Sequence, residues 1–179
     1  GQTLDVLIEL GVPGGRCGCR SVDDALALAQ TMVDIGKLAG RPVVAVITSM
    51  AQPLGTHIGN ALEVKDAIDV LAGRTQGDLL EISLLLGSHM LVLAEKTKTL
   101  PEARTMLENA ISSGAGLRKL AEMIAAQGGD PRVVEDLSLL PQAAVKRVMR
   151  AETAGYLSAM DTTALGMAAQ RMGAGRAKK

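Results

Sequence analysis

The sequence predicts an α/β fold, rich in helix, in which a small mixed or partly parallel sheet is flanked by several helices. Two observations lead to this prediction. A run rich in Val and Ile at residues 43–48 follows a helical pattern and an earlier apolar segment, which makes a strand, helix, strand order. From residue 60 onward, helical patterns dominate. A strand-helix-strand unit of this length favours two parallel strands joined by a right-handed crossover.

The first strand and helix of this unit lie before residue 40. Leu4 to Leu10 is predicted as a strand, and the segment after it, which contains Gly, Pro and Cys, as a loop. Ser21, followed three residues later by Asp24, predicts an N-cap for a helix that runs to about Leu38. Gly40 ends this helix.

The second strand is predicted at Val43–Thr48, and the turn Gln52-Pro53-Leu54-Gly55 cannot continue it. Asn60 is a predicted cap for a helix to Ala72, whose apolar face carries Ala61, Val64, Ala67, Ile68 and Leu71. Loops that follow a strand in such units commonly bind ligands. Residues 52–59 are therefore a candidate site.

Three further helices are predicted, at Leu79–Ala94, from Thr99 to about Ser112, and at Leu117–Ala126. Asp78 can cap the first of these. Thr99 and Glu102 form a capping box for the second, with Pro101 in its first turn.

The remaining chain is predicted to change character after Leu140-Pro141. Asp130-Pro131 opens a short helix before that break. After it come two predicted strands and a final helix capped by Asp161, at Val145–Arg150, Gly155–Met160 and Thr162–Met172. We expect a single partial α/β domain over residues 1–179, with the strand-helix core and helical segment at 1–142 and the short strands and final helix at 143–179.

Several blocks of the sequence resemble a known family. They are Gln52-Pro53-Leu54-Gly55, Gly59 to Lys65, Gly87 to Ala94, Ala126 to Pro131, and Gly155 to Asp161 continuing to Gly173-Ala174-Gly175-Arg176. In this order they resemble the pyrimidine-nucleoside phosphorylases, which include thymidine phosphorylase and cleave pyrimidine nucleosides with phosphate. The resemblance extends from about Leu4 to Arg176 and implies a glycosyltransferase (pentosyltransferase) lineage in pyrimidine metabolism.

The resemblance also implies that much of the family's chain is missing here. Family members are more than twice as long, and their phosphate loop and the Arg, Ser and Lys that hold the pyrimidine precede the matched region. None of those motifs occurs in this sequence. The resemblance therefore assigns no catalytic and no substrate-binding residue, and the sequence reads as an internal fragment. Phosphate and a pyrimidine nucleoside are expected partners only of an intact parent enzyme.

The early segment departs from the family pattern. Family members have Asp-Val-Lys and then a short turn rich in Gly, whereas Asp5-Val6 here continues into residues 7–20 without that Lys. An altered reading frame, an engineered insertion and natural divergence each account for this difference. The glycines at 11–18 match neither common phosphate-loop template, and Cys17 and Cys19 are too close for an ordinary disulfide framework.

One metal site is implied by the resemblance. In the family, two backbone carbonyls of the Pro-Leu-Gly loop and a carboxylate on the next helix bind a monovalent cation, usually described as potassium. The matching positions are Leu54 and His57 for the carbonyls and Asp66 for the carboxylate. Asp66 stands where family members commonly have Glu, so its reach is one methylene shorter. In the alternative interpretation, Asp66 is a solvated helix residue and Leu54 packs. No other cofactor is expected.

Composition restricts the classes of function. An apolar fraction of 47% suffices for a core, and 19 basic residues balance 19 acidic ones, so no net charge attracts nucleic acid or an anionic membrane. Tyr156 is the only aromatic residue, which leaves no stacking platform for bases. The apolar stretch at 79–94 is shorter than the ~20 residues of a membrane span. No signal peptide is evident, and we expect a cytoplasmic location.

Two hypotheses about function follow. In the first, the chain is part of the α/β domain of a pyrimidine-nucleoside phosphorylase and is inactive alone, because phosphorolysis needs a phosphate cradle and positive groups near the departing base. In the second, it is a stand-alone or engineered scaffold or interaction module that self-associates through exposed sheet edges. A homo-oligomer, or complementation by the missing domain, is the expected partnership.

Overall fold

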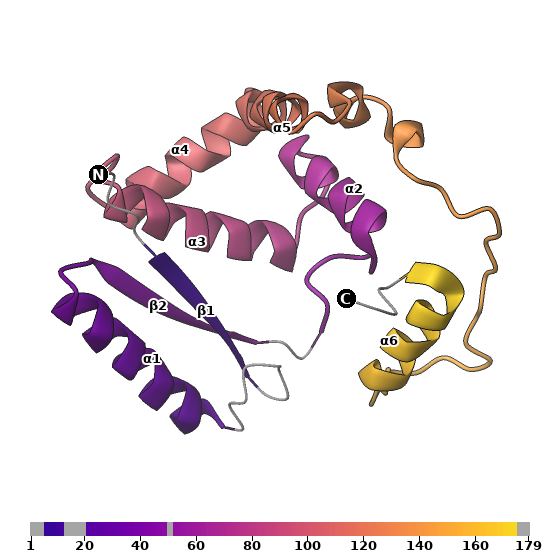
Figure 1. Ribbon diagram of the computed structural model, residues 1–179, viewed down its shortest axis with the longest axis horizontal. Helices are drawn as coiled ribbons and strands as arrows, with labels where there is room; N and C mark the ends of the chain where they lie inside the picture. Colours follow the sequence, from indigo (N-terminus) through magenta and orange to yellow (C-terminus); the bar gives the residue numbers. More distant parts are fainter. Residues whose placement is uncertain (1–5, 13–20, 50–51, 175–179) are drawn as a thin grey trace. The chain divides into compact units, whose positions relative to one another are not determined.

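The computed structural model describes residues 6–12, 21–49 and 52–174, with only the backbone described at 6–12. The chain divides into two compact units, residues 1–140 and 141–179. The described residues form six α-helices, three short helical turns and two strands (Figure 1). The predicted helix-rich α/β class is therefore confirmed.

The two strands, β1 (Val6–Val12) and β2 (Val43–Ser49), pair in parallel. Val6 lies opposite Val43, and the pairing continues to Val12 opposite Ser49. The prediction for β2 is accurate to one residue. The predicted end of the first strand at Leu10 is wrong, because Gly11 and Val12 still pair with β2. The predicted start at Leu4 and the loop residues 13–20, including Cys17 and Cys19, lie outside the described residues.

Helix α1 (Val22–Leu38) joins the two strands and packs along them (Figure 1). The predicted cap is confirmed, since the Ser21 hydroxyl accepts a hydrogen bond from the Asp24 backbone N–H at 3.1 Å. Ala25 is fully buried, and Ile47 of β2 packs against it. Gly36 allows the close approach of helix and strand, because a Cβ there would lie 2.2 Å from the Val43 Cγ2.

Four helices follow in the same unit: α2 (Asn60–Leu71), α3 (Asp78–Leu93), α4 (Leu100–Ser112) and α5 (Ala115–Ala126). The predicted caps Asn60 and Asp78 are wrong, because each is the first residue of its helix. Gly59 and Gly77 occupy the cap positions with φ of 129° and 119°. Such a backbone favours glycine, which explains why a side-chain cap is replaced there.

The apolar core of these helices centres on α3. Leu80 and Leu84 are buried with Val70 of α2, and the partly buried Leu79, Leu107 and Ile111 pack against them. Arg104 of α4 adds a two-pronged contact to Glu81 of α3, with both N–O distances 3.0 Å. This ion pair is exposed, so apolar burial contributes most of the stability.

The local signals at the next helix starts are confirmed. The Thr99 hydroxyl accepts from the Glu102 N–H at 3.4 Å, and the Glu102 carboxylate accepts from the Thr99 N–H at 3.2 Å, which completes the predicted capping box. The short helix predicted at Asp130-Pro131 is a 3-10 turn, Pro131–Val134, and a second one follows at Leu137–Leu139.

The second unit contains helix α6 (Thr162–Ala169), which continues as a π-helical turn, Gln170–Ala174. The Asp161 carboxylate caps α6 by accepting from the Ala164 N–H at 2.8 Å, as predicted. The predicted strands Val145–Arg150 and Gly155–Met160 are wrong, since residues 141–160 contain neither helix nor strand. Their side chains are exposed, and a strand needs both a paired backbone and an apolar face to pack against.

Candidate functional site

The loop between β2 and α2 is the best-organised polar feature among the described residues. Gly59 is the N-cap of α2, and its N–H donates to the Glu63 carboxylate at 2.9 Å. Glu63 thus satisfies one of the backbone N–H groups that no helical carbonyl can reach. The first turn of α2 is fixed by this contact, and Asp66 follows on the next turn.

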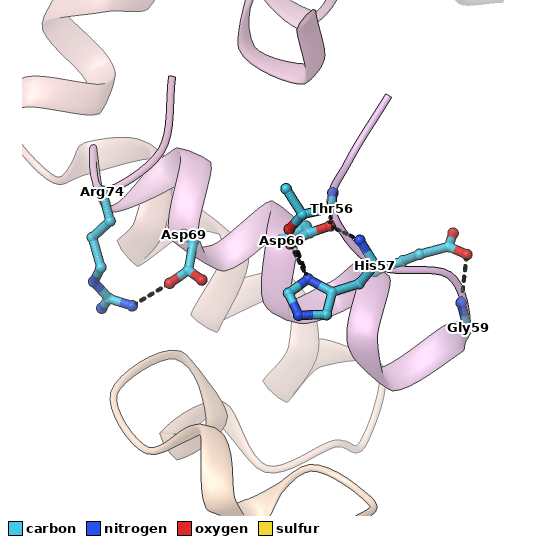
Figure 2. A network of polar contacts seen from close by, with 7 residues as sticks. Thr56, His57, Gly59, Asp66, Asp69 and Arg74 are labelled. Atoms are coloured by element: carbon cyan, nitrogen blue, oxygen red, sulfur yellow. Dashed lines mark hydrogen bonds and ion pairs between the residues drawn. The ribbon is translucent and has the colours of Figure 1, made fainter. Parts of the chain in front are cut away.

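Asp66 is the centre of the site (Figure 2). Its side chain points from α2 back to the loop, and the residue is only 7% exposed. Oδ2 accepts from the backbone N–H groups of Thr56 and His57, at 3.0 and 3.1 Å. Oδ1 accepts from the Thr56 hydroxyl at 3.2 Å and lies 2.6 Å from Nδ1 of His57.

The contact between His57 and Asp66 places a proton on one of the two ring nitrogens of His57. An ionised carboxylate only accepts hydrogen bonds, so the Nδ1 atom 2.6 Å from Asp66 carries a proton. The Thr56 hydroxyl lies 3.0 Å from the same Nδ1. Backbone and side chains of two successive loop residues therefore close on one carboxylate.

These contacts determine the charge of Asp66. Burial by itself would raise the pKa of the carboxyl, but hydrogen bonds from His57 and Thr56 outweigh burial and hold the pKa below its ordinary value of 3.8. Asp66 is therefore ionised at neutral pH. The prediction that treats Asp66 as a solvated helix residue does not describe this side chain, which is buried.

Gly55 makes the close approach possible. A Cβ at position 55 would lie 2.4 Å from Oδ2 of Asp66, which is shorter than any stable contact. The loop backbone and the carboxylate could not come together with a larger residue there. Gly55 thus has a steric role in the site.

A cavity of about 400 Å³ opens beside this network. It brings together all three residues predicted to bind a cation, and it is lined by Pro53, Leu54, Gly55, His57, Ile58, Glu63, Asp66, Ala67 and Leu79. Among the described residues, no group of three or more His, Cys, Asp or Glu side chains could hold a metal ion. Any cation here would depend on backbone carbonyls.

The donor set around Asp66 fits a direct cation ligand poorly. A carboxylate has about four lone-pair positions, and four donors from Thr56 and His57 already point at them. A potassium ion would have to displace at least one of these hydrogen bonds. That Leu54, His57 and Asp66 bind potassium stays a prediction, because the geometry bears only on the Asp66 carboxylate and not on the two backbone carbonyls.

Sequence reasoning missed two residues of the site. Thr56 supplies two of the four donors, and Glu63 holds the helix start, yet neither was predicted to act. Glu63 lies four residues after Gly59, and this short spacing at a helix start could have predicted the contact from the sequence. No comparable pattern in the sequence predicts the role of Thr56, because its partner Asp66 is ten residues away on another element.

None of the helices in the described part of the chain is long and apolar enough to cross a membrane.

Strand β2, the loop after it and helix α2 all lie within the region that matches a protein-family model. The family model described as "Glycosyl transferase family, a/b domain" matches residues 12–117, more than half of the chain. The chain belongs to this glycosyl transferase family.

Individual relatives narrow the class. The chain is 51% identical over 160 residues to the pyrimidine-nucleoside phosphorylase of Geobacillus stearothermophilus, 49% over 166 residues to that of Bacillus subtilis, and 46% over 166 residues to that of Staphylococcus aureus. These alignments cover 89% to 93% of the chain but only 37% to 38% of the relatives' lengths. The resemblance to pyrimidine-nucleoside phosphorylases is confirmed, for a part of such a protein.

Proposed function

We propose that the chain contributes the α/β part of a pyrimidine-nucleoside phosphorylase and is inactive by itself. The identity of 46% to 51% along most of the chain is the observation that supports this most strongly. In this proposal, the whole protein transfers a pentosyl group from a pyrimidine nucleoside to phosphate. Free base and a pentose 1-phosphate are the products.

The chemistry explains why one part does not suffice. Attack by phosphate requires an anion held in line with the glycosidic bond, and positive groups that stabilise the departing base. The cavity beside Asp66 is lined by two carboxylates, His57 and apolar groups, which does not favour a dianion. We propose that the strand, loop and helix of this part form one side of an active site whose phosphate- and pyrimidine-binding residues belong to another part of the whole protein.

A chimaera tests the proposal directly. The matched segment of the Bacillus subtilis pyrimidine-nucleoside phosphorylase is replaced by the corresponding residues of this chain, and release of free base from thymidine or uridine with phosphate is measured. We expect turnover by the chimaera and none by the isolated chain. Turnover by the isolated chain would disprove inactivity, and a folded chimaera without turnover would disprove the assignment to this reaction.

A matched pair of variants compares a crowded glycine of the loop with an open one outside it. Gly55→Val in the chimaera places a side chain against the Asp66 carboxylate and should abolish turnover, whereas Gly155→Val, where a Cβ meets nothing within 4 Å, should retain it. Equal activity of both variants would show that the loop does not serve the site.

The second hypothesis, self-association through exposed sheet edges, stays a prediction, and one observation favours self-association through a different surface. Helix α1 exposes several large apolar side chains in the described unit, namely Val22, Leu26, Ile35 and Leu38. Exposed apolar side chains of this size favour contact with another surface. We expect light scattering to show an oligomer whose mass falls when Leu26 and Ile35 are both changed to Lys. A monomer at every concentration would contradict this alternative.

A further inference from the structure

The loop between β2 and α2 is closed by its own groups. Oδ1 and Oδ2 of Asp66 each receive two donors, and all four come from Thr56 and His57. The backbone donors are two successive N–H groups, so the loop wraps around one oxygen. The carboxylate thus takes the place that an external anion would take among these N–H donors.

The space around the carboxylate supports the same conclusion. Gly55 approaches so closely that even a Cβ would lie 2.4 Å from Oδ2. Glu63, the other carboxylate of the cavity lining, accepts from the Gly59 N–H at 2.9 Å and is thus used at the helix start. Both carboxylates that line the cavity are therefore already engaged in hydrogen bonds within the described site (Figure 2).

We infer that Asp66 closes the 52–59 loop directly, and that the order of this loop is independent of potassium or any other monovalent cation. Oxygen ligands attract a hard cation when they are free to surround it. Here binding would first require the loss of a charge-assisted hydrogen bond, which is among the stronger contacts in a protein. The inference rests on the loop geometry alone and holds whether or not the proposed enzymatic role is correct.

Amide hydrogen exchange measured by NMR on the full chain tests this inference. The probes are potassium chloride and tetramethylammonium chloride at equal ionic strength, since the large organic cation cannot replace potassium among protein oxygens. We expect the Thr56 and His57 amides to exchange at the same rate in both salts. Slower exchange in potassium would overturn the inference.

Two substitutions on the same helix provide the matched comparison. Asp66→Asn removes the charge and one acceptor oxygen, and exchange of the Thr56 and His57 amides should rise by about tenfold. Asp69→Asn removes a carboxylate that pairs with Arg74 at 2.6 Å, away from the loop, and should leave both amides unchanged. Equal exchange in the two variants would overturn the inference.

A milder variant keeps the test usable if Asp66→Asn does not fold. Thr56→Val removes only the hydroxyl donor to Oδ1 and retains both backbone donors. We expect faster exchange of the His57 amide and still no difference between the two salts. Slower exchange in potassium than in tetramethylammonium in this variant would contradict the inference. Unchanged exchange of the His57 amide in Thr56→Val would contradict it.

Discussion

Residues 43–49 and residues 145–160 are both rich in apolar side chains, yet only the first segment forms a strand. All seven residues of β2 pair with β1, and Ile47 packs against the buried Ala25 of α1. In the second segment, Val148 and Tyr156 are exposed, and the described chain assigns it no strand. Propensity becomes structure where a second backbone and an apolar surface both meet the segment.

The two units also differ in how deeply their apolar side chains are buried. The described residues of the first unit contain all of the fully or nearly fully buried apolar side chains, such as Ile68 and Leu84. Described residues of the second unit are exposed or, at Ala169, half-buried. Substitutions should therefore cost much in the first unit and little in the second.

The largest expected effect comes from truncating the core. Leu84→Ala should lower the free energy of unfolding by about 3 kcal/mol, because the side chain is buried among α2, α3 and α4 residues and leaves a cavity. Leu157→Ala in the second unit should change it by less than about 0.5 kcal/mol, since that side chain is exposed. Urea unfolding followed by circular dichroism measures both, and similar losses would remove the contrast.

Steric crowding should follow at a smaller magnitude. Gly36→Val forces a side chain against Val43, whose Cγ2 would lie 2.2 Å from the new Cβ, and should cost about 2 kcal/mol. Gly155→Val meets nothing within 4 Å and should be tolerated within about 0.5 kcal/mol. The same urea titration distinguishes them. A neutral Gly36→Val would mean that α1 and β2 do not approach as closely as described.

Removing a helix cap should lower the global stability in the first unit but should affect only the local helix in the second. Thr99→Ala removes the capping box of α4 and should cost about 1 kcal/mol of global stability, because α4 packs on α3. Asp161→Ala should increase hydrogen exchange only in α6 and leave the global unfolding midpoint unchanged. A shift of that midpoint by Asp161→Ala would show that α6 is coupled to the rest of the protein.

The smallest effect concerns an exposed local pair. Hydrogen bonds from Arg132 hold the pKa of the Asp130 carboxyl at about 2, below the ordinary 3.8. Because folding lowers this pKa, the contribution of ionised Asp130 to the stability of the folded state is complete above pH 3.8. It is lost as the pH falls through about 2. Carboxyl NMR titration should show this value, and Arg132→Gln should move it toward 3.8. A wild-type pKa already at 3.8 would refute the contact.

The outcome of each sequence-based prediction depends on how far apart the interacting residues lie. Ser21 with Asp24, Thr99 with Glu102, and Asp161 with Ala164 are contacts across three residues, and these helix starts were predicted correctly. Asn60 and Asp78 were assigned as caps from residue type alone. The positive φ of the preceding glycines, which decided the matter, depends on how the loop enters the helix.

The site was predicted only in part. The loop at 52–59 and the importance of Asp66 could be inferred from the resemblance and from the strand-loop-helix order. The four donors around Asp66 and the steric role of Gly55 could not, because they join residues nine to eleven positions apart whose approach is set by the packing of α2.

The amino-acid sequence by itself determined the helix-rich α/β class, the family and most helix boundaries, because apolar periodicity and capping act over a few neighbouring residues. Only the tertiary structure decided which apolar runs became strands and which carboxylate was buried. Both depend on the desolvation and pairing of groups brought together from separate parts of the chain, and such energies belong to the pair rather than to either residue.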